Sequence, residues 1–318
     1  MAASDLPTSY NTLSIPDLQL SHHPSTSPTV TPVIILKLHR PAARNAFTDQ
    51  LATSLITAYD LLSRDPRVRC IVLTSSDPSN RFFCAGMDLS VKHSSFGPTI
   101  AEHRDGGGQV TLAMHRCSKP IVAAINGSAV GVGITMTLPA AVRVASRDAK
   151  VGFVFGRRGF NMEACSSFYL PRLIGTSRAV HLVTTGAVYK ASDRLLGELF
   201  SDVVAPDEVL PRALSIAQDI AANMSPVAAR VMRDLIYRGP ASPEEAHLLE
   251  SKVFFDLVNG ADSKEGVESF LQKRAPDFKA TMETDAPSAW PWWSPVDVTA
   301  PSKQVSQAPI DLKKSSKL

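Results

Sequence analysis

Two short segments combine a buried apolar run with glycines at its end. FFCAGMDL covers residues 82–89, and INGSAVGVGIT covers residues 125–135. Glycine lets a backbone turn tightly, and it lets a ligand approach an N–H group with no Cβ in the way. Two N–H groups aimed at one oxygen would form an oxyanion hole, which stabilises negative charge on a reacting carbonyl oxygen. For either segment alone, a tight strand-to-helix turn is the alternative interpretation.

A carboxylate with apolar neighbours supplies a second chemical element. Glu163 lies in GRRGFNMEACSSFYLPRL, where Phe160, Met162 and Phe168 flank it. A carboxylate can take a proton from a carbon next to a carbonyl group and return it elsewhere. Apolar neighbours would exclude water and raise the pKa of Glu163. The alternative is a glutamate that interacts with the positive end of a helix dipole.

The other glycine-rich segments do not fit nucleotide-binding motifs. Gly131-Val132-Gly133 lacks the third glycine of a dinucleotide fingerprint, and VRVAS ends in Ser146 where an acidic residue would be needed. Gly106-Gly107-Gly108 is not followed by Lys-Ser or Lys-Thr, so it predicts a flexible loop and no phosphate cradle.

Composition excludes several classes of function. The 318 residues carry a formal charge of +3 with no basic stripe, so we expect no nucleic-acid partner. The four cysteines form no C-x-x-C pair and have no histidine at ligand spacing, so we expect no zinc or other metal site. No apolar run is long enough to span a bilayer, and the N-terminus lacks signal-peptide features.

Hydrophobic periodicity predicts an α/β core followed by helices. Residues 31–40, 67–76 and 119–127 read as strands. Residues 47–66 contain a helix that Thr48 or Asp49 can cap and that ends before Pro66. After residue 177 only helices are expected. The predicted parts are a flexible N-terminal extension, in which SIPDLQL could add an edge strand, then an α/β core, a helical region and a disordered tail rich in Pro and Ser, over residues 1–30, 31–200, 201–278 and 279–318.

The sequence ends in Ser316-Lys317-Leu318. A C-terminal S-K-L is an address read by the peroxisomal import receptor. We therefore expect peroxisomal localisation, with the import receptor as a partner, although a chance tripeptide is the alternative.

Five separate blocks together resemble the crotonase, or enoyl-CoA hydratase/isomerase, superfamily over about residues 31–278. They are HRPAARNAF, RFFCAGMDL, KPIVAAINGSAVGVG, MEACSSFYLPRLIG and SKEGVESFLQKRAPDF. The resemblance implies the ClpP/crotonase-like fold, which has repeated ββα units and a C-terminal helical region that forms trimers, often paired into hexamers. It also implies acyl-CoA thioesters as substrates, with coenzyme A as part of the substrate and no separate cofactor.

The resemblance assigns roles to individual residues. It implies that the backbone N–H groups of Met87 and Val132 hold the thioester oxygen. It places the adenine of coenzyme A near the backbone of Ala85-Gly86. The phosphate contacts that it suggests are Arg44 and Lys273, for which solvated surface cations are the alternative. Asp88 is a further candidate beside the coenzyme and as a second acid, although its position at the first turn after a strand favours a role in capping the next element.

The acid–base residues depart from the usual hydratase pattern. Many hydratases of the family use two glutamates, and the matching positions here are Thr135 and Phe155. The block around Glu163-Ala164-Cys165 is instead similar to peroxisomal Δ3,Δ2-enoyl-CoA isomerases, in which a glutamate at this place is the base. It also resembles the fungal enoyl-CoA isomerase/hydratase branch.

We therefore expect an enoyl-CoA isomerase, with or without hydratase activity, that uses Glu163 as its acid and base in peroxisomal fatty-acid or specialised acyl metabolism. Two alternatives remain at this point. One is a pathway-specific acyl-CoA hydratase or dehydratase of secondary metabolism, acting for example on a toxin or siderophore side chain. The other is a crotonase-fold protein that binds acyl-CoA without turnover.

Overall fold

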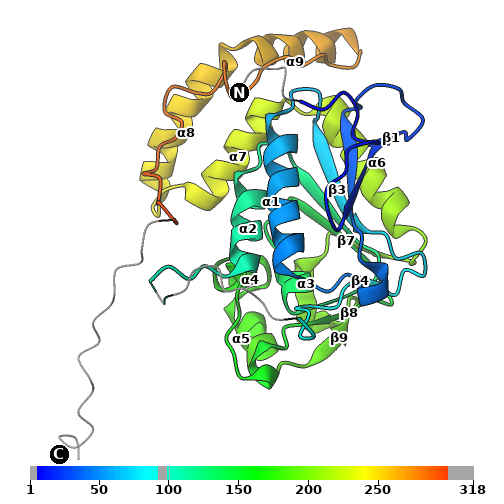
Figure 1. Ribbon diagram of the computed structural model, residues 1–318. Helices are drawn as coiled ribbons and strands as arrows, with labels where there is room; N and C mark the ends of the chain where they lie inside the picture. Colours follow the sequence, from blue (N-terminus) through cyan, green and yellow to red (C-terminus); the bar gives the residue numbers. More distant parts are fainter. Residues whose placement is uncertain (1–5, 92–98, 100, 300–318) are drawn as a thin grey trace, which may run out of the picture.

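A computed structural model describes residues 6–91, 99 and 101–299 (Figure 1). Within these residues the strands form two sheets. The larger sheet has six strands in the order β1-β2-β3-β5-β7-β10, and the smaller has four in the order β4-β6-β8-β9. No described helix is both long enough and apolar enough to cross a membrane.

From β3 to β8, successive strands alternate between the two sheets, which is the pattern of repeated ββα units. In the first unit, β3 (Cys70–Ser75) joins the large sheet, β4 (Phe82–Cys84) joins the small one, and α2 (Gly106–Arg116) follows. The next units repeat it with β5 (Ile121–Ile125), β6 (Ser128–Val130) and α3 (Val132–Thr135), then with β7 (Val142–Ser146), β8 (Lys150–Gly152) and α4 (Ser166–Ile174). The expected α/β fold of crotonase type is therefore confirmed.

The large sheet is buried on both faces, because its residues alternate between two apolar clusters. Leu36 of β2 (Val33–Leu38) and Leu73 of β3 face α1 (Asp49–Arg64) and α2, whereas Val72 of β3 faces α6 (Val209–Asn223). Strands covered on both sides become continuous apolar runs, as in CIVLTS and IVAAI. Thr48 caps α1 as predicted, since its side chain accepts a hydrogen bond from Leu51 N.

The predicted flexible N-terminal extension is wrong for residues 6–30. The strand β1 (Leu18–His23) pairs antiparallel with β2 as the edge strand of the large sheet and buries Leu18 and Leu20, as the alternating pattern of LQLSHH allows. Tyr10 is fully buried, and its hydroxyl donates to Asp65 at 2.9 Å. The suggestion of an added edge strand is therefore confirmed.

The predicted boundary at residue 200 is also wrong. Two short strands follow residue 177, β9 (Val188–Lys190) and β10 (Asp202–Val204), and β10 pairs in parallel with β7. Because α6 then covers one face of the large sheet, the core extends through residue 223. The remaining elements are α5 (Thr176–Thr185), η2 (Pro41–Ala43), η3 (Phe155–Arg158), η4 (Arg194–Leu199), α7 (Pro226–Arg238), α8 (Pro243–Val258) and α9 (Ala261–Gln272).

Part of the predicted disordered tail packs on the C-terminal helices. The indole N–H of Trp290 donates to the buried carboxylate of Asp234 at 3.0 Å, and that of Trp292 donates to the carbonyl of Arg238. A disordered tail is therefore wrong for residues 279–299, because indole rings can supply both apolar area and a donor. The tripeptide Ser316-Lys317-Leu318 lies outside the described residues.

The Trp290 contact gives a stability prediction. Replacing Trp290 with Phe keeps most of the ring and removes the donor to Asp234. We expect the free energy of unfolding to fall by roughly 1 to 2 kcal/mol, because the lost hydrogen bond is made to a carboxylate and is partly buried. Urea unfolding measures the change. Trp293→Phe is the matched control, since Trp293 meets the other two indoles edge-on in the same cluster. Equal midpoints for the two variants would contradict the prediction.

Candidate active site

The two glycine-rich segments lie side by side, because β4 and β6 pair in parallel in the small sheet. The chain that follows each strand therefore leaves the sheet at the same edge. A cavity of about 240 Å³ opens there. It is mostly apolar, and its described lining consists of Ala85, Gly86, Met87, Leu89, Val130, Gly131, Val132, Val154, Phe155, Arg158, Phe160 and Glu163.

The backbone N–H of Met87 is directed away from the neighbouring strand-like segment. Phe47 N donates to the carbonyl of Gly86 at 2.8 Å, and Asp88 N donates to the carbonyl of Phe47 at 2.9 Å. In this parallel bridge the residue between the two bonded neighbours points its own N–H to the opposite side. The N–H of Met87 is thus available to a group in the cavity.

Val132 supplies the second N–H because it is the first residue of α3. The first N–H groups of a helix have no partner within the helix. Nearby backbone groups are already paired, since Gly131 N donates to Gly152 and both Ile134 N and Thr135 N donate to Gly131. Neither Val132 N nor Met87 N donates to the backbone of another described residue. The structure therefore brings both predicted donors to one cavity.

Gly86 is required by the turn that presents Met87. Its φ is +94°, a conformation that side chains disfavour, and a Cβ at this position would lie 2.9 Å from the carbonyl oxygen of Val130. Gly86 thus lets the turn that presents Met87 pack closely against β6, the strand that leads to Val132.

Glu163 reaches the same cavity from the segment before α4. Its Oε1 accepts a hydrogen bond from the Thr135 hydroxyl at 2.7 Å, whereas its buried Oε2 has no hydrogen-bond partner among the described residues. Burial raises the pKa of Glu163 to about 8. The Thr135 hydroxyl opposes this shift, and the nearby Asp105 carboxylate adds to it. Glu163 can therefore change protonation state close to neutral pH.

The first turn of α2 faces the Glu163 carboxyl group, and its glycines make room for it. A Cβ on Gly107 would lie 2.9 Å from Glu163 Cδ and still closer to Oε2. The predicted flexible loop at residues 106–108 is therefore wrong. These glycines open a helix whose N-cap is Asp105, because its side chain accepts from Gly108 N.

Sequence reasoning missed Asp105. An aspartate placed directly before a helix start is a common N-cap signal, and three consecutive glycines obscured it because glycine disfavours helices. The residues between this helix and Leu89 include 92–98 and 100, which lie outside the described residues.

Of the predicted coenzyme contacts, those near the first turn lie close to the cavity. Ala85 and Gly86 line it, and Ala85 N donates to the carbonyl of Arg44. The Arg44 guanidinium stacks over the ring of Phe82, 5.2 Å from its centroid. Asp88 accepts from the backbone N–H and hydroxyl of Ser90 and forms an ion pair with Arg40 at 3.2 Å, so it closes a turn. No described helix or strand begins directly after it.

The structure does not bring Lys273 to this site. Lys273 follows the last residue of α9 and has a left-handed backbone conformation. Figure 1 shows α9 at the opposite end of the molecule from β4 and β8. Within one chain, the predicted grouping of Lys273 with Arg44 and Ala85 is therefore wrong, because the C-terminal helices extend away from the small sheet.

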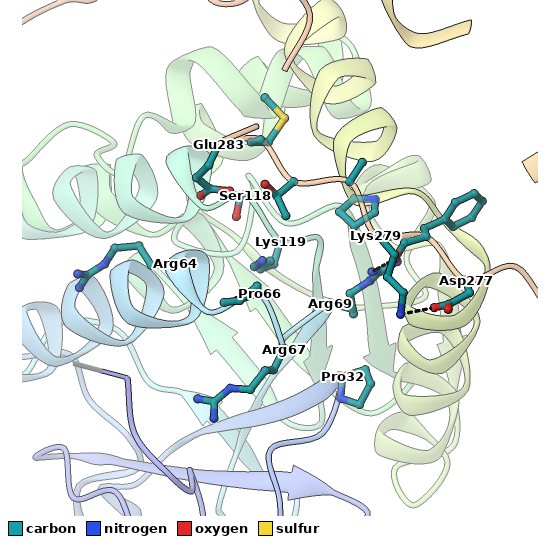
Figure 2. Close-up of a pocket in the computed structure, with 15 residues that line it drawn as sticks. Pro32, Arg64, Pro66, Arg67, Arg69, Ser118, Lys119, Asp277, Lys279 and Glu283 are labelled. Carbon is teal, nitrogen blue, oxygen red and sulfur yellow. Dashed lines mark hydrogen bonds and ion pairs between the residues drawn. The ribbon is translucent and has the colours of Figure 1, made fainter. Parts of the chain in front are cut away.

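A larger cavity, of about 370 Å³, lies at the edge where the parallel strands β2, β3 and β5 begin. Figure 2 shows cations around it, but several already interact with the chain itself. Arg67 pairs with Asp65, Lys279 pairs with Asp277, and Arg69 donates to the carbonyl of Phe278. The Arg69 bond attaches the segment after α9 to the core. Neither glycine-rich turn reaches this cavity.

Comparison with known proteins assigns the chain to a family. The model of the enoyl-CoA hydratase/isomerase family matches residues 29–281, and the chain belongs to that family. A curated relative, enoyl-CoA hydratase AFT3-1 of Alternaria alternata, is 50% identical over 256 residues, which are 80% of this chain and 86% of the relative. Enoyl-CoA hydratase ACTT3 of the same organism is 49% identical over 256 residues, with the same coverage of 80% and 86%.

A solved structure agrees with this assignment. A probable enoyl-CoA hydratase/isomerase from Mycobacterium abscessus superposes with a TM-score of 0.70 at 32% identity, covering 79% of this chain and 96% of that one. The expected membership of the crotonase superfamily is confirmed, and an acyl-CoA activity of the enoyl-CoA hydratase/isomerase type is supported.

The fit between Gly107 and Glu163 gives a second prediction. Gly107→Ala would displace the Glu163 carboxyl group, and a displacement of about 1 Å can cost about 100-fold in rate. Alanine also favours a helix over glycine, so we expect the melting temperature to be retained. Gly156→Ala is the control, because a Cβ there has its nearest neighbour 3.9 Å away. Steady-state kinetics with an enoyl-CoA and thermal melts make the comparison, and full activity in Gly107→Ala would contradict it.

Proposed function

We propose that this protein moves the double bond of an enoyl-CoA from C3 to C2, with Glu163 as the single proton carrier. The observation that carries the proposal is the pairing of one buried carboxyl group with two backbone donors at one apolar cavity. Proton removal from C2 makes an enolate whose charge gathers on the thioester oxygen. The N–H groups of Met87 and Val132 would stabilise that oxygen, and losing one such donor typically costs about 2.7 to 4 kcal/mol.

One carboxyl group suffices for this reaction, since the proton taken from C2 can be returned to C4 from the same face. Thr135 serves both protonation states of Glu163. Its hydroxyl can donate to the carboxylate, or it can accept from the carboxylic acid while donating to the carbonyl of Gly131 at 3.3 Å. The apolar wall that includes Phe155 and Phe160 would keep water from the enolate.

Hydration of a 2-enoyl-CoA is the second candidate. The names of the Alternaria alternata relatives, which are enoyl-CoA hydratases at about 50% identity, favour it. In that reaction Glu163 would activate a water molecule and then protonate C2. Phe155 offers no group to hold the water, so the described part of the cavity suits isomerisation better. A pathway-specific acyl substrate is compatible with either reaction.

The deciding experiment supplies a 3-enoyl-CoA and, separately, a 2-enoyl-CoA, and follows product mass and double-bond position. The isomerase proposal expects a product of unchanged mass from the 3-enoyl substrate. Glu163→Gln should lower its rate by about 100- to 10,000-fold. A product heavier by one water from the 2-enoyl substrate alone would replace isomerase with hydratase. Binding of acyl-CoA without turnover of either substrate would instead indicate a non-catalytic binding protein.

The raised pKa of Glu163 predicts the pH dependence of isomerisation. A base must be deprotonated in the free enzyme, so kcat/KM should rise with pH and level off above a midpoint near 8. Measurements between pH 6 and 9 with a 3-enoyl-CoA test this. A profile that is flat, or that falls across this range, would exclude Glu163 as the group that takes the first proton.

We also propose a homotrimer or hexamer and peroxisomal localisation. Large apolar side chains of α8 and α9 are exposed, among them Phe254, Phe255 and Phe270, at 68%, 68% and 81%. Such a surface favours association. Light scattering would report the oligomeric state.

Localisation rests on Ser316-Lys317-Leu318, and a tagged protein that lacks these residues should remain outside peroxisomes.

A further inference from the structure

We infer that Asp105 is a positioning residue for Glu163: it holds the turn that carries the glutamate, and its charge favours the protonated form of that side chain. This inference rests on the proposed function, in which Glu163 carries the proton. The residue is not part of the cavity lining, so it acts through its neighbours.

Asp105 connects two segments that are far apart in the sequence. Its Oδ1 accepts a hydrogen bond from Gly108 N, which caps α2, and another from Ala164 N at 3.2 Å. The carbonyl of Glu163 is held on the other side of the same turn, because Ser166 N donates to it at 3.0 Å and the Ser166 hydroxyl donates as well. The peptide between Glu163 and Ala164 is thus fixed at both its oxygen and its nitrogen.

The turn needs this support because two consecutive residues other than glycine have a left-handed backbone conformation. Ala164 has a φ of +55° and Cys165 a φ of +51°. Residues in this region are strained and persist only where the surrounding structure holds them, and such strain is concentrated at functional sites. Relaxing the turn would rotate the Glu163 side chain away from Thr135, whose hydroxyl lies 2.7 Å from Oε1.

The second part of the inference concerns charge. Asp105 and Glu163 both face the first turn of α2. A Cβ on Gly107 would meet the Glu163 carboxyl group, and a Cβ on Gly108 would meet the Asp105 carboxyl group. Asp105 is itself exposed, so water partly screens its charge, but a like charge this near still disfavours ionisation of the more buried Glu163 carboxyl group. Other titratable groups interact with or adjoin Glu163, namely Cys84 of β4, Cys165 of its own turn and, across the cavity, Arg158 of η3. Asp105 is the carboxylate among the groups that interact with or adjoin Glu163.

Asp105→Asn separates charge from hydrogen bonding, because asparagine keeps an oxygen for Gly108 N and Ala164 N and removes the negative charge. We expect the pH midpoint of kcat/KM to move to lower pH, with KM little changed. Thr135→Val is the opposing control. It removes a donor to the ionised form of Glu163, so the midpoint should move to higher pH.

Asp105→Ala removes both the charge and the accepting oxygen. We expect the melting temperature and kcat to fall together in this variant, whereas Asp105→Asn restores the melting temperature. An unchanged kcat in Asp105→Ala, or an unmoved midpoint in Asp105→Asn, would overturn the inference.

A readout without turnover separates this inference from the proposed function. A carboxyl group with a raised pKa stabilises the fold fully below the pKa of the unfolded chain, and this contribution is lost as pH rises toward the folded value near 8. The difference in melting temperature between the protein and Glu163→Gln should therefore change between about pH 4.5 and 8, and the change should end at lower pH when both chains also carry Asp105→Asn.

If this thermal shift appears while Glu163→Gln keeps full activity, the inference about Asp105 stands and the proposed role of Glu163 in turnover fails. If the melting-temperature difference ends at the same pH with and without Asp105→Asn, the inference about Asp105 fails, whatever the activity of the Glu163 variant.

Discussion

The burial of one carboxyl group is the constraint on which the rest of the site depends. An ionised carboxylate in an apolar cavity is costly, so the surrounding structure must supply specific partners or accept the protonated form. Here it does both. Thr135 provides a hydroxyl that serves either state, the first turn of α2 is free of side chains at Gly107, and the segment before α4 is held from both sides. Each of these features would be unnecessary around a solvated glutamate.

The repeated ββα arrangement explains how distant segments meet around this group. Because the second strand of each unit joins the small sheet, the chain after β4 and the chain after β6 emerge together, and each contributes a backbone N–H. The helix that follows the first unit, α2, then places its N-terminus against Glu163. The first strand of each unit belongs to the large sheet, whose side chains are mostly buried, so the short second strands start from fixed positions.

Patterns of local chemistry made much of this predictable from the sequence. The glycines after two apolar runs predicted two turns that present N–H groups, and the family resemblance assigned those groups to Met87 and Val132. Apolar neighbours predicted a raised pKa for Glu163. Other features depended on tertiary contacts that carry no local signal. The helix start at Gly106 was hidden by three glycines, and at Gly107 the Glu163 carboxyl group occupies the space of a side chain. The packing of Trp290 depends on Asp234, which is 56 residues away in the sequence. Composition alone suggested disorder at both ends of the chain.

The apolar wall of the cavity has a consequence for the fate of individual hydrogen atoms. Among the described residues that line the cavity, Glu163 and Arg158 are the titratable ones, and Arg158 is exposed. A proton held on Glu163 thus has few routes to solvent while the substrate closes the opening. In the proposed isomerisation, the hydrogen that leaves C2 would then be the hydrogen that arrives at C4. The cavity would conserve the isotopic identity of its substrate as well as its mass, and its walls would decide how faithfully it does so.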